Sequence, residues 1–385
     1  MEPTTLPDRT AWEGRPVLVT GGASLIGSHL TAALVDLGAD VTVVDDLSSG
    51  SRENIKHLLK AGRISFYEAD LRDARETRRA MEGVDTLFHL AAIHGGRGYV
   101  DLHQTACAEN LYLDGLVFRT ARDTKVRQVV FASSGCVYPL YRQRDPSSDL
   151  LLTEDLVGPP YEADGMYGNA KLMGELTLRS LHEEHGMDTA SCRYFTVYGP
   201  RGIENHAVIA MMARALVRQD PFVIWGDGTQ VRNWTHVSDI VNGTIMAAER
   251  IHDGTAVNLG TQERIQVVEA ARLICDLAGH DPTFVFRTDM PVGPVNRIAS
   301  FERASHLLGW RPQVSFAEGV RDTFAWYRNH RDPQRLAGVL DRLLTERGVH
   351  SVAPVDAAPA ARPRSEELEA VMPTAERSPA AAALR

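Results

Sequence analysis

Short apolar segments rich in β-branched residues alternate with longer amphipathic segments between residues 17 and 195. The first apolar segment ends in a glycine turn at Gly21 and is followed by a helical pattern that continues to Leu37. Further strands are expected over residues 41–44 and 126–131. Because strands separated by helices pair in parallel within one sheet, this pattern predicts an α/β fold with a doubly wound, Rossmann-like parallel sheet.

The apolar pattern weakens toward the end of the chain. Residues 331–350 are expected to contain a last helix, whose apolar stripe would pack on the domain or on a partner subunit and consists of Leu336, Val339, Leu340, Leu343 and Leu344. Residues 351–385 are rich in Ala, Pro, Glu and Arg and have no aromatic residue. Such a segment buries too little apolar surface to offset the entropy of ordering, so we expect a disordered tail.

Composition and charge narrow the class of protein. The 385 residues are 44% hydrophobic, which is enough for one large or two modest cores. A net charge of −9 argues against nucleic acid or an anionic membrane as a partner. No apolar run approaches the roughly 18 residues that span a bilayer, and the polar N-terminus is unlike a signal peptide, so a cytoplasmic location is expected. The four cysteines lack C-x-x-C spacing, so neither a metal site nor a disulfide framework is expected.

The glycine turn and the end of the second expected strand predict a nucleotide site. Residues 16–27 read as strand, tight turn and helix, which places helix N-terminal amides where they can hold a pyrophosphate. The second strand ends in Asp45, 24 residues after Gly21. A carboxylate at that distance accepts both ribose hydroxyls of an adenosine and repels a 2′-phosphate, so NAD is favoured over NADP.

A tyrosine and a lysine on one helical face provide candidate chemistry. Tyr167 and Lys171 are four residues apart, so on a helix they share one side. A nearby ammonium favours the phenolate and is expected to lower the pKa of Tyr167. Tyr167 is therefore a candidate base for the hydroxyl of a sugar or another alcohol.

These motifs together resemble the extended short-chain dehydrogenase/reductase family of nucleotide-sugar epimerases, dehydratases and decarboxylases, over about residues 15–330. The family opens with T-G-G-x-G-x-x-G, and here Ser24 replaces the middle glycine. Its Cβ takes up room beside the pyrophosphate, while its hydroxyl is placed to donate to a phosphate oxygen. The cofactor-binding residues that the resemblance implies are Gly21, Ser24, Leu25, Ile26, Gly27, Asp45, Asp70, Leu71, Ala91, Tyr167 and Lys171.

The resemblance also implies an organisation into domains. Residues 15–195 would form the NAD-binding domain, to which a segment near 233–260 returns. Residues 196–232 and 261–330 would form a smaller lobe that binds a nucleotide-diphosphate sugar. Residues 1–14 are expected to be flexible, and the assembly is expected to be a homodimer.

Within the lobe, arginines are the expected ligands of the substrate. The segment around Arg232 resembles the family signature for the arginine that binds the substrate diphosphate. Arg297 is a second candidate for this role. A guanidinium suits this role because its fork makes paired, charge-assisted hydrogen bonds. Thr196 stands where the family usually has Asn, so that substrate contact is expected to be weaker or absent.

The kind of reaction depends on Cys136. By position Ser134 is the family's catalytic Ser/Thr, and Lys171 would hold the nicotinamide ribose. Dehydratases and decarboxylases usually carry Glu where Cys136 stands, whereas enzymes resembling GDP-mannose 3,5-epimerase and GDP-fucose synthase carry a cysteine that exchanges protons at sugar carbons. The loop with Gly95, Gly96 and Arg97 also resembles the G-G-x-G loop of the GDP-mannose epimerase.

Inversion at two centres needs a second acid/base on the opposite face of the sugar. The resembling enzymes have His or Lys seven residues after the tyrosine of the Y-G-P motif, a position that Asn205 occupies here, with His206 next. His206 transfers protons at neutral pH and Asn205 does not, so His206 is the candidate if the loop differs by one residue. Otherwise the enzyme inverts one centre.

The sequence therefore predicts an NAD-dependent nucleotide-sugar epimerase that acts through a transient 4-keto sugar, of the 3,5-epimerase type. A 4-epimerase is the nearest alternative, followed by a decarboxylase or 4,6-dehydratase, which the missing Glu disfavours. A nucleotide-binding scaffold without turnover is the alternative from a different class. The nucleotide base and the sugar are not encoded in these motifs.

Overall fold

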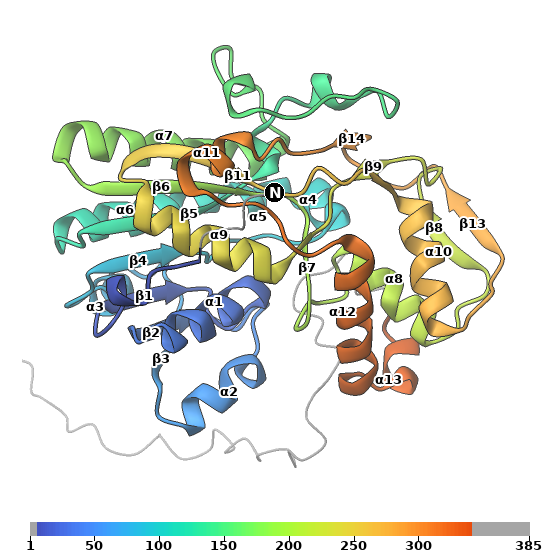
Figure 1. The fold of residues 1–385 in the computed structure, drawn as a ribbon, viewed down its shortest axis with the longest axis horizontal. Coiled ribbons are helices and arrows are strands. Elements are labelled where there is room, and N and C mark those ends of the chain that lie inside the picture. Colours follow the sequence, from blue (N-terminus) through green and yellow to red (C-terminus); the bar gives the residue numbers. More distant parts are fainter. Residues whose placement is uncertain (1–5, 341–385) are drawn as a thin grey trace, which may run out of the picture. The chain divides into compact units, whose positions relative to one another are not determined.

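The computed structural model describes residues 6–340, and all of them fall in one compact unit. A seven-stranded parallel sheet forms its centre, as the sequence predicts (Figure 1). The strands, in spatial order, are β11 (Asp253–Leu259), β6 (Asp188–Tyr194), β5 (Gln128–Ser134), β4 (Thr86–His89), β1 (Pro16–Thr20), β2 (Asp40–Asp45) and β3 (Ile64–Glu68). The predicted doubly wound α/β fold is therefore confirmed.

Both faces of the sheet are buried under helices. The helices that supply core side chains on one face are α1 (Leu25–Asp36), α2 (Arg52–Lys60), α9 (Val237–Arg250) and α11 (Glu302–Leu308). Those on the other face are α3 (Ala74–Ala80), α6 (Asn110–Asp123) and α7 (Gly165–His185). Successive residues of a strand point to opposite faces, so Val17 and Val19 join the first core and Leu18 the second. This explains why the strands read as continuous apolar runs.

The order of the strands creates the crevice in which ligands bind. The chain moves outward from β1 through β2 to β3 and then returns to β4 on the other side of β1. Helices that follow β1 and β4 therefore lie on opposite faces, which leaves an opening at the carboxyl ends of these strands. The glycine turn follows β1 at this edge, and Ser134 ends β5 at the same edge.

A second group of elements packs around its own core at one end of the sheet (Figure 1). Its strands are β8 (Phe222–Trp225), β13 (Phe284–Arg287), β9 (Val231–Arg232), β12 (Ile265–Gln266) and β14 (Asn296–Arg297). Its helices are α8 (Ala207–Leu216), α10 (Val267–Ala278), α12 (Phe316–His330) and α13 (Pro333–Ala337). Because all described residues form one compact unit, the boundary between domain and lobe at residue 195 stays a prediction.

The remaining elements are shorter. They are η1 (Arg9–Ala11), α4 (Arg97–Leu102), α5 (Gln104–Ala108), η2 (Gly135–Val137), η3 (Leu140–Gln143), η4 (Glu154–Leu156), β7 (Val197–Tyr198) and β10 (Thr235–His236). Strands β7 and β10 pair in parallel, so the chain segments that enter and leave the lobe lie side by side. None of the described helices is long and apolar enough to cross a membrane.

The N-terminal segment differs from the expectation that residues 1–14 are flexible. Residues 9–11 form η1, and Trp12 is fully buried in the core beneath α1 and α9. The indole packs on Phe88, with 5.7 Å between ring centroids, and its Nε1 donates to Glu249 Oε1 at 2.7 Å. The prediction was wrong here because a polar segment with one large aromatic residue gains enough burial from that residue to be ordered.

The last predicted helix begins within the described residues. Helix α13 ends at Ala337, and Leu336 is buried in the core of the lobe. The rest of the predicted helix beyond residue 340 lies outside the described residues, as does the predicted tail, residues 351–385.

Replacing Trp12 with Ala should lower the free energy of unfolding by about 3–5 kcal/mol, because it empties a buried aromatic site and leaves Glu249 without its indole donor. Chemical denaturation of both proteins measures the difference. Leu6→Ala is the control, since Leu6 is 73% exposed and should change stability by less than about 0.5 kcal/mol. Equal stability of Trp12→Ala and the parent would show that the N-terminal segment contributes little.

Candidate functional site

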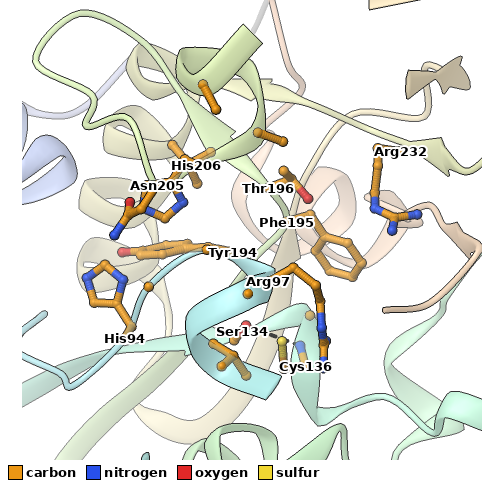
Figure 2. Close-up of a pocket in the computed structure, with 18 of the residues that line it drawn as sticks. His94, Arg97, Ser134, Cys136, Tyr194, Phe195, Thr196, Asn205, His206 and Arg232 are labelled. Carbon is orange, nitrogen blue, oxygen red and sulfur yellow. Dashed lines mark hydrogen bonds between the residues drawn. The ribbon is translucent and has the colours of Figure 1, made fainter. Parts of the chain in front are cut away.

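A cavity of about 400 Å³ opens at the carboxyl edge of the sheet and extends under the lobe (Figure 2). The predicted catalytic residues Ser134, Cys136, Tyr167, Lys171 and His206 all line it. The predicted substrate-binding residues that line it are Gly95, Gly96, Arg97, Thr196, Arg232 and Arg297. The structure thus brings together side chains that are distant in the chain, such as Arg97 and Arg297, which are 200 residues apart.

The predicted cofactor residues gather around a second cavity of about 250 Å³. It shares Ser24 and Leu90 with the larger cavity. The predicted cofactor-binding residues that line it are Gly21, Ser24, Asp45, Asp70, Leu71 and Ala91. Leu25 and Ile26, at the start of α1, line the larger cavity instead.

The glycine turn fits closely between β1 and α1. Gly21 has φ +68°, which is in the left-handed region, and a Cβ on Gly27 would lie 2.1 Å from the Gly21 carbonyl oxygen. Only glycine fits at Gly27, and α1 therefore begins directly against the turn. Ser24 tolerates its side chain because its φ is −81°, and its hydroxyl donates to the Gly21 carbonyl at 2.6 Å.

Carboxylates at the second cavity are held in defined positions. Asp45 Oδ2 accepts from the Ala23 amide at 2.9 Å and Oδ1 accepts from the Leu47 amide at 2.8 Å. Asp70 accepts from the Arg72 guanidinium, and this hydrogen bond lowers the pKa of Asp70 against the opposing effect of burial. Both side chains line the cavity, and the lowered pKa keeps Asp70 ionised at neutral pH.

Tyr167 and Lys171 differ from expectation in their protonation. Both project from α7 into the large cavity, with Lys171 Nζ 5.8 Å from the Tyr167 ring centroid. Burial raises the pKa of Tyr167, and the Ser134 side chain opposes this rise. Burial also lowers the pKa of Lys171. The predicted lowering of the Tyr167 pKa is therefore wrong for this structure, because the cost of burying the charged phenolate outweighs the effect of the Ser134 hydrogen bond.

Cys136 contacts an arginine from the lobe. Its amide donates to Ser134 Oγ at 3.1 Å, and its sulfur accepts from Arg297 Nη1 at 3.2 Å. Cys136 is half-buried, whereas Cys107, Cys192 and Cys275 are buried. The thiol therefore faces the cavity with a cation beside it.

Each nitrogen of the Arg297 guanidinium contacts a side chain of the protein. Its Nε donates to Gln143 Oε1 at 2.7 Å, and its Nη2 donates to Asp164 Oδ2 at 3.0 Å. With Nη1 directed at Cys136, each nitrogen of the guanidinium has a protein partner. The sequence prediction missed this because Gln143, Asp164 and Cys136 are all more than 130 residues away.

Arg232 fits an anion better. It donates to the Val231 and Val292 carbonyls at 2.9 Å each, and among residues 6–340 no carboxylate forms an ion pair with it. Burial lowers the pKa of Arg232, and the neighbouring Arg297 and Arg97 lower it further. A cation in such surroundings gains stability from any anion that enters the cavity.

Asp164 is a residue that the sequence analysis did not single out. It is 1% exposed and accepts from Arg97 Nη1 at 2.7 Å as well as from Arg297. Burial acts to raise its pKa, but the two arginines lower it overall. An Asp just before the helix that carries Tyr167 is recognisable from sequence as an N-cap, whereas its ion pairs are not.

The loop that carries Asn205 and His206 packs against the glycine-rich loop. A Cβ on Gly96 would lie 1.7 Å from the Asn205 carbonyl oxygen, so the two backbones are in direct contact. Burial lowers the pKa of His206 to about 4, so the imidazole is neutral at pH 7. Figure 2 shows His206 and Asn205 on a different side of the cavity from Cys136.

Thr196 lines the same cavity with an unusual backbone. Its φ is +25°, which is rare for a β-branched residue, and its carbonyl accepts from the Thr235 amide at 3.2 Å. Strain of this kind persists where the surrounding structure holds a residue in place.

Comparison with known proteins agrees with this geometry. Residues 17–260 match the NAD dependent epimerase/dehydratase family. A protein of Bacillus subtilis named an uncharacterized UDP-glucose epimerase is 33% identical over 318 residues, which are 80% of this chain and 97% of that protein. GDP-mannose 3,5-epimerase of Arabidopsis thaliana is 26% identical over 331 residues, which are 85% of each chain.

A solved structure shows the same fold with ligands. The UDP-glucuronic acid 4-epimerase of Bacillus cereus, in complex with UDP-glucuronic acid and NAD, superimposes with a TM-score of 0.73 at 27% identity and covers 82% of this chain and 99% of its own. The cofactor of the family is NAD, in agreement with the glycine turn and the carboxylate at the end of β2. The chain belongs to the NAD-dependent epimerase/dehydratase family, whose members act on nucleotide sugars.

Proposed function

We propose that this chain is an NAD-dependent nucleotide-sugar epimerase of the 3,5-epimerase type, which acts through a transient 4-keto sugar. The observation that carries the proposal is the position of Cys136: its thiol faces the cavity that Ser134 and Tyr167 line, with Arg297 Nη1 at 3.2 Å. Likeness to GDP-mannose 3,5-epimerase of Arabidopsis thaliana supports the same reading.

The residues around the glycine turn fit the cofactor. The amides at the start of α1 would hold the pyrophosphate, and Asp45 would accept the ribose hydroxyls. Lys171 Nζ is buried and, within residues 6–340, has no hydrogen-bond partner, as expected for a group that binds a ligand. When bound, NAD supplies an acceptor for hydride from C4 of the sugar and later returns it.

Ser134 and Tyr167 would handle the proton of the C4 hydroxyl. Their side chains interact and face the cavity together. Tyr167 would accept the proton of the C4 hydroxyl as a phenolate and return it from the phenol when the hydride returns; burial, which raises its pKa, disfavours the phenolate in the free protein. The ammonium of Lys171 would stabilise the phenolate while it exists.

Cys136 and His206 would then exchange protons at carbons beside the C4 ketone. Oxidation at C4 makes the neighbouring C–H bonds acidic, and the Arg297 cation attracts negative charge that develops on the sulfur. His206 is neutral at pH 7 and lies on another side of the cavity, where it could reach the opposite face of the ring. Arg232 would bind the diphosphate of the substrate, since it lacks a carboxylate partner among the described residues.

A 4-epimerase is the second candidate. The Bacillus subtilis relative is named for UDP-glucose epimerase activity, and the Bacillus cereus structure is that of a 4-epimerase. That reaction needs Ser134, Tyr167 and Lys171 but leaves Cys136 and His206 without a chemical role. A scaffold without turnover is disfavoured because these three residues share one cavity.

Substituting Gly27 by Ala should weaken NAD binding by at least about tenfold, because the added Cβ would lie 2.1 Å from the Gly21 carbonyl oxygen and push α1 away from the turn. Titration followed by tryptophan fluorescence measures the affinity, and thermal unfolding checks that the variant is folded. Gly115→Ala is a matched control, since its Cβ meets nothing within 4 Å. Unchanged affinity of a folded Gly27→Ala protein would rule out this turn as the pyrophosphate site.

Tyr167→Phe should lower kcat by at least about a hundredfold while NAD affinity changes less than about threefold, because the ring stays and the proton-accepting oxygen is lost. Steady-state kinetics and cofactor titration separate the two effects. Tyr161→Phe serves as the control, because Tyr161 is 44% exposed and does not line the cavity. Retained turnover in Tyr167→Phe would mean that another group handles the C4 proton.

Turnover in D2O should place deuterium on the sugar if Cys136 exchanges protons at carbons beside the ketone, and mass spectrometry detects it. Cys136→Ser should stop the uptake on the ring face that Cys136 serves yet still oxidise C4, seen as reduced-cofactor absorbance, because an alcohol is a far weaker acid than a thiol. Cys275→Ser, in the core of the lobe, is the control. Product inverted at C4 without deuterium would replace the 3,5 assignment by the 4-epimerase.

The same experiment tests His206. His206→Asn should remove deuterium from one ring carbon and leave it at the other, because each residue serves one face of the sugar. Unchanged labelling at both carbons would exclude His206 as the second acid/base.

A further inference from the structure

A chain of buried polar groups runs beneath the cofactor end of the site. Thr20 ends β1 and lies opposite His89, which ends β4. Thr20 Oγ1 is 2.8 Å from His89 Nδ1, and His89 Nε2 is 3.0 Å from Asp114 Oδ1 on α6. Thr20 and His89 are fully buried and Asp114 is 3% exposed. None of the three has a role in the chemistry described above, yet burying them carries a cost that their hydrogen bonds must offset.

Asp114 determines the direction of these hydrogen bonds. A carboxylate accepts and cannot donate, so His89 donates from Nε2 and its Nδ1 accepts from the Thr20 hydroxyl. The Thr20 hydroxyl proton is then donated to His89. The Thr20 oxygen accepts hydrogen bonds from the Leu90 amide at 3.1 Å and the Ala91 amide at 3.2 Å. Burial lowers the pKa of His89, with Asp114 opposing, and the neutral ring is the form that fits this order.

The backbone that Thr20 holds is part of the cofactor site. Leu90 lines both cavities and Ala91 lines the smaller one. The Ala91 amide nitrogen lies 2.9 Å from the position of a Cβ on Gly21, so the segment rests directly on the glycine turn. A reversal of the Thr20 hydrogen bond would leave a proton pointing at two amide donors, which is unfavourable.

The second oxygen of Asp114 relates it to Lys171. Asp114 Oδ2 and Lys171 Nζ are both buried, and within residues 6–340 neither has a hydrogen-bond partner. Nζ lies 4.4 Å from the centroid of the Phe131 ring. Burial lowers the pKa of Lys171, and the negative charge of Asp114 opposes that fall. Without this charge, a buried ammonium would lose its proton more easily.

Other titratable groups around Lys171 also need to be considered. His89 faces it from β4 and Tyr167 from its own helix, while Cys107 from α5 and Cys136 from η2 act on Tyr167. Burial raises the pKa of Tyr167, and the charge of Asp114 raises it further. Asp114 therefore shifts Tyr167 and Lys171 in the same direction.

We propose that Asp114 is a positioning residue for the cofactor end of the site. It sets the order of hydrogen bonds through His89 and Thr20 that holds the backbone at Leu90 and Ala91, and its negative charge acts on the buried Lys171. The second part rests on the proposed function, in which Lys171 binds the cofactor ribose. The first part concerns the free protein and does not depend on which sugar reaction occurs.

Asp114→Asn tests the role of the charge, because it keeps the shape of the side chain. NAD affinity, titrated as a function of pH, should fall on the alkaline side as Lys171 loses its proton. In Asp114→Asn the pH at which NAD affinity falls should be lower by about one unit or more. NAD affinity at low pH, where Lys171 is protonated in both proteins, should change less than about threefold. The rise of turnover at acid pH and its fall at alkaline pH should both move to lower pH, because the pKa values of Tyr167 and Lys171 both drop.

Asp123→Asn is the matched control, since Asp123 lies at the exposed end of the same helix and pairs with Arg122. It should leave both profiles in place. A structural role alone would make Asp114→Asn weaken NAD binding by the same factor at every pH, and that result, or an unmoved profile, would overturn the role of the charge.

Nitrogen NMR of the free protein labelled in its histidine rings tests the hydrogen-bond order. The His89 signals, assigned by their loss in His89→Gln, should show a proton on Nε2 and none on Nδ1 in the parent. In Asp114→Ala, where Nε2 has no carboxylate, a proton on Nδ1 should become populated. A single Nε2–H form in both proteins, or a proton on Nδ1 in the parent, would overturn the positioning role.

The outcomes separate this inference from the proposed function. If turnover in D2O excludes the 3,5 reaction but the NAD profile and the His89 tautomer respond as described, the role of Asp114 stands. If the sugar reaction is as proposed and neither readout responds, the role of Asp114 falls alone.

Discussion

Asp164 lies between Arg97 and Arg297 and accepts a hydrogen bond from both. The carboxylate stands at the start of α7, the helix that carries Tyr167 and Lys171, while the two arginines come from α4 and β14. Three segments that are distant in sequence therefore meet at one buried charge. Removing that charge would leave the buried Arg297 without a counter-ion, whereas Arg97 would keep Asp101, and an uncompensated buried charge typically costs several kcal/mol. The position of the helix relative to the lobe depends on this interaction.

The same interaction defines the charge of the cavity. Asp164 is shared by two arginines, and Arg97 also pairs with Asp101, whereas Arg232 donates to backbone carbonyls. The lobe side of the cavity therefore keeps an excess of positive charge, and the side near the glycine turn presents Asp45 and Asp70. An elongated ligand with an anionic centre and hydroxyl groups at one end fits this distribution. A nucleotide sugar bound next to a dinucleotide has that chemistry.

Features encoded by spacing along the chain were predictable from the sequence. The parallel sheet, the glycine turn and the shared face of Tyr167 and Lys171 depend on residues close in sequence, and the structure has all three. Features that depend on contacts between distant segments were not. The burial of Trp12, the approach of Arg297 to Cys136 and the raised pKa of Tyr167 each follow from packing that no local pattern records. Roles of individual site residues belong to the second kind.

The contact between Gly96 and Asn205 has a consequence for the range of sugars that the cavity admits. With no space for even a methyl group between them, the two loops form a fixed wall whose width is set by bare backbone. A larger residue at Gly96 would clash with the Asn205 backbone and displace the loop that carries His206 outward by roughly the thickness of a methyl group. Redesign of the pocket for a bulkier ligand would accordingly begin with the backbone separation between Gly96 and Asn205, before any side chain in the cavity is altered.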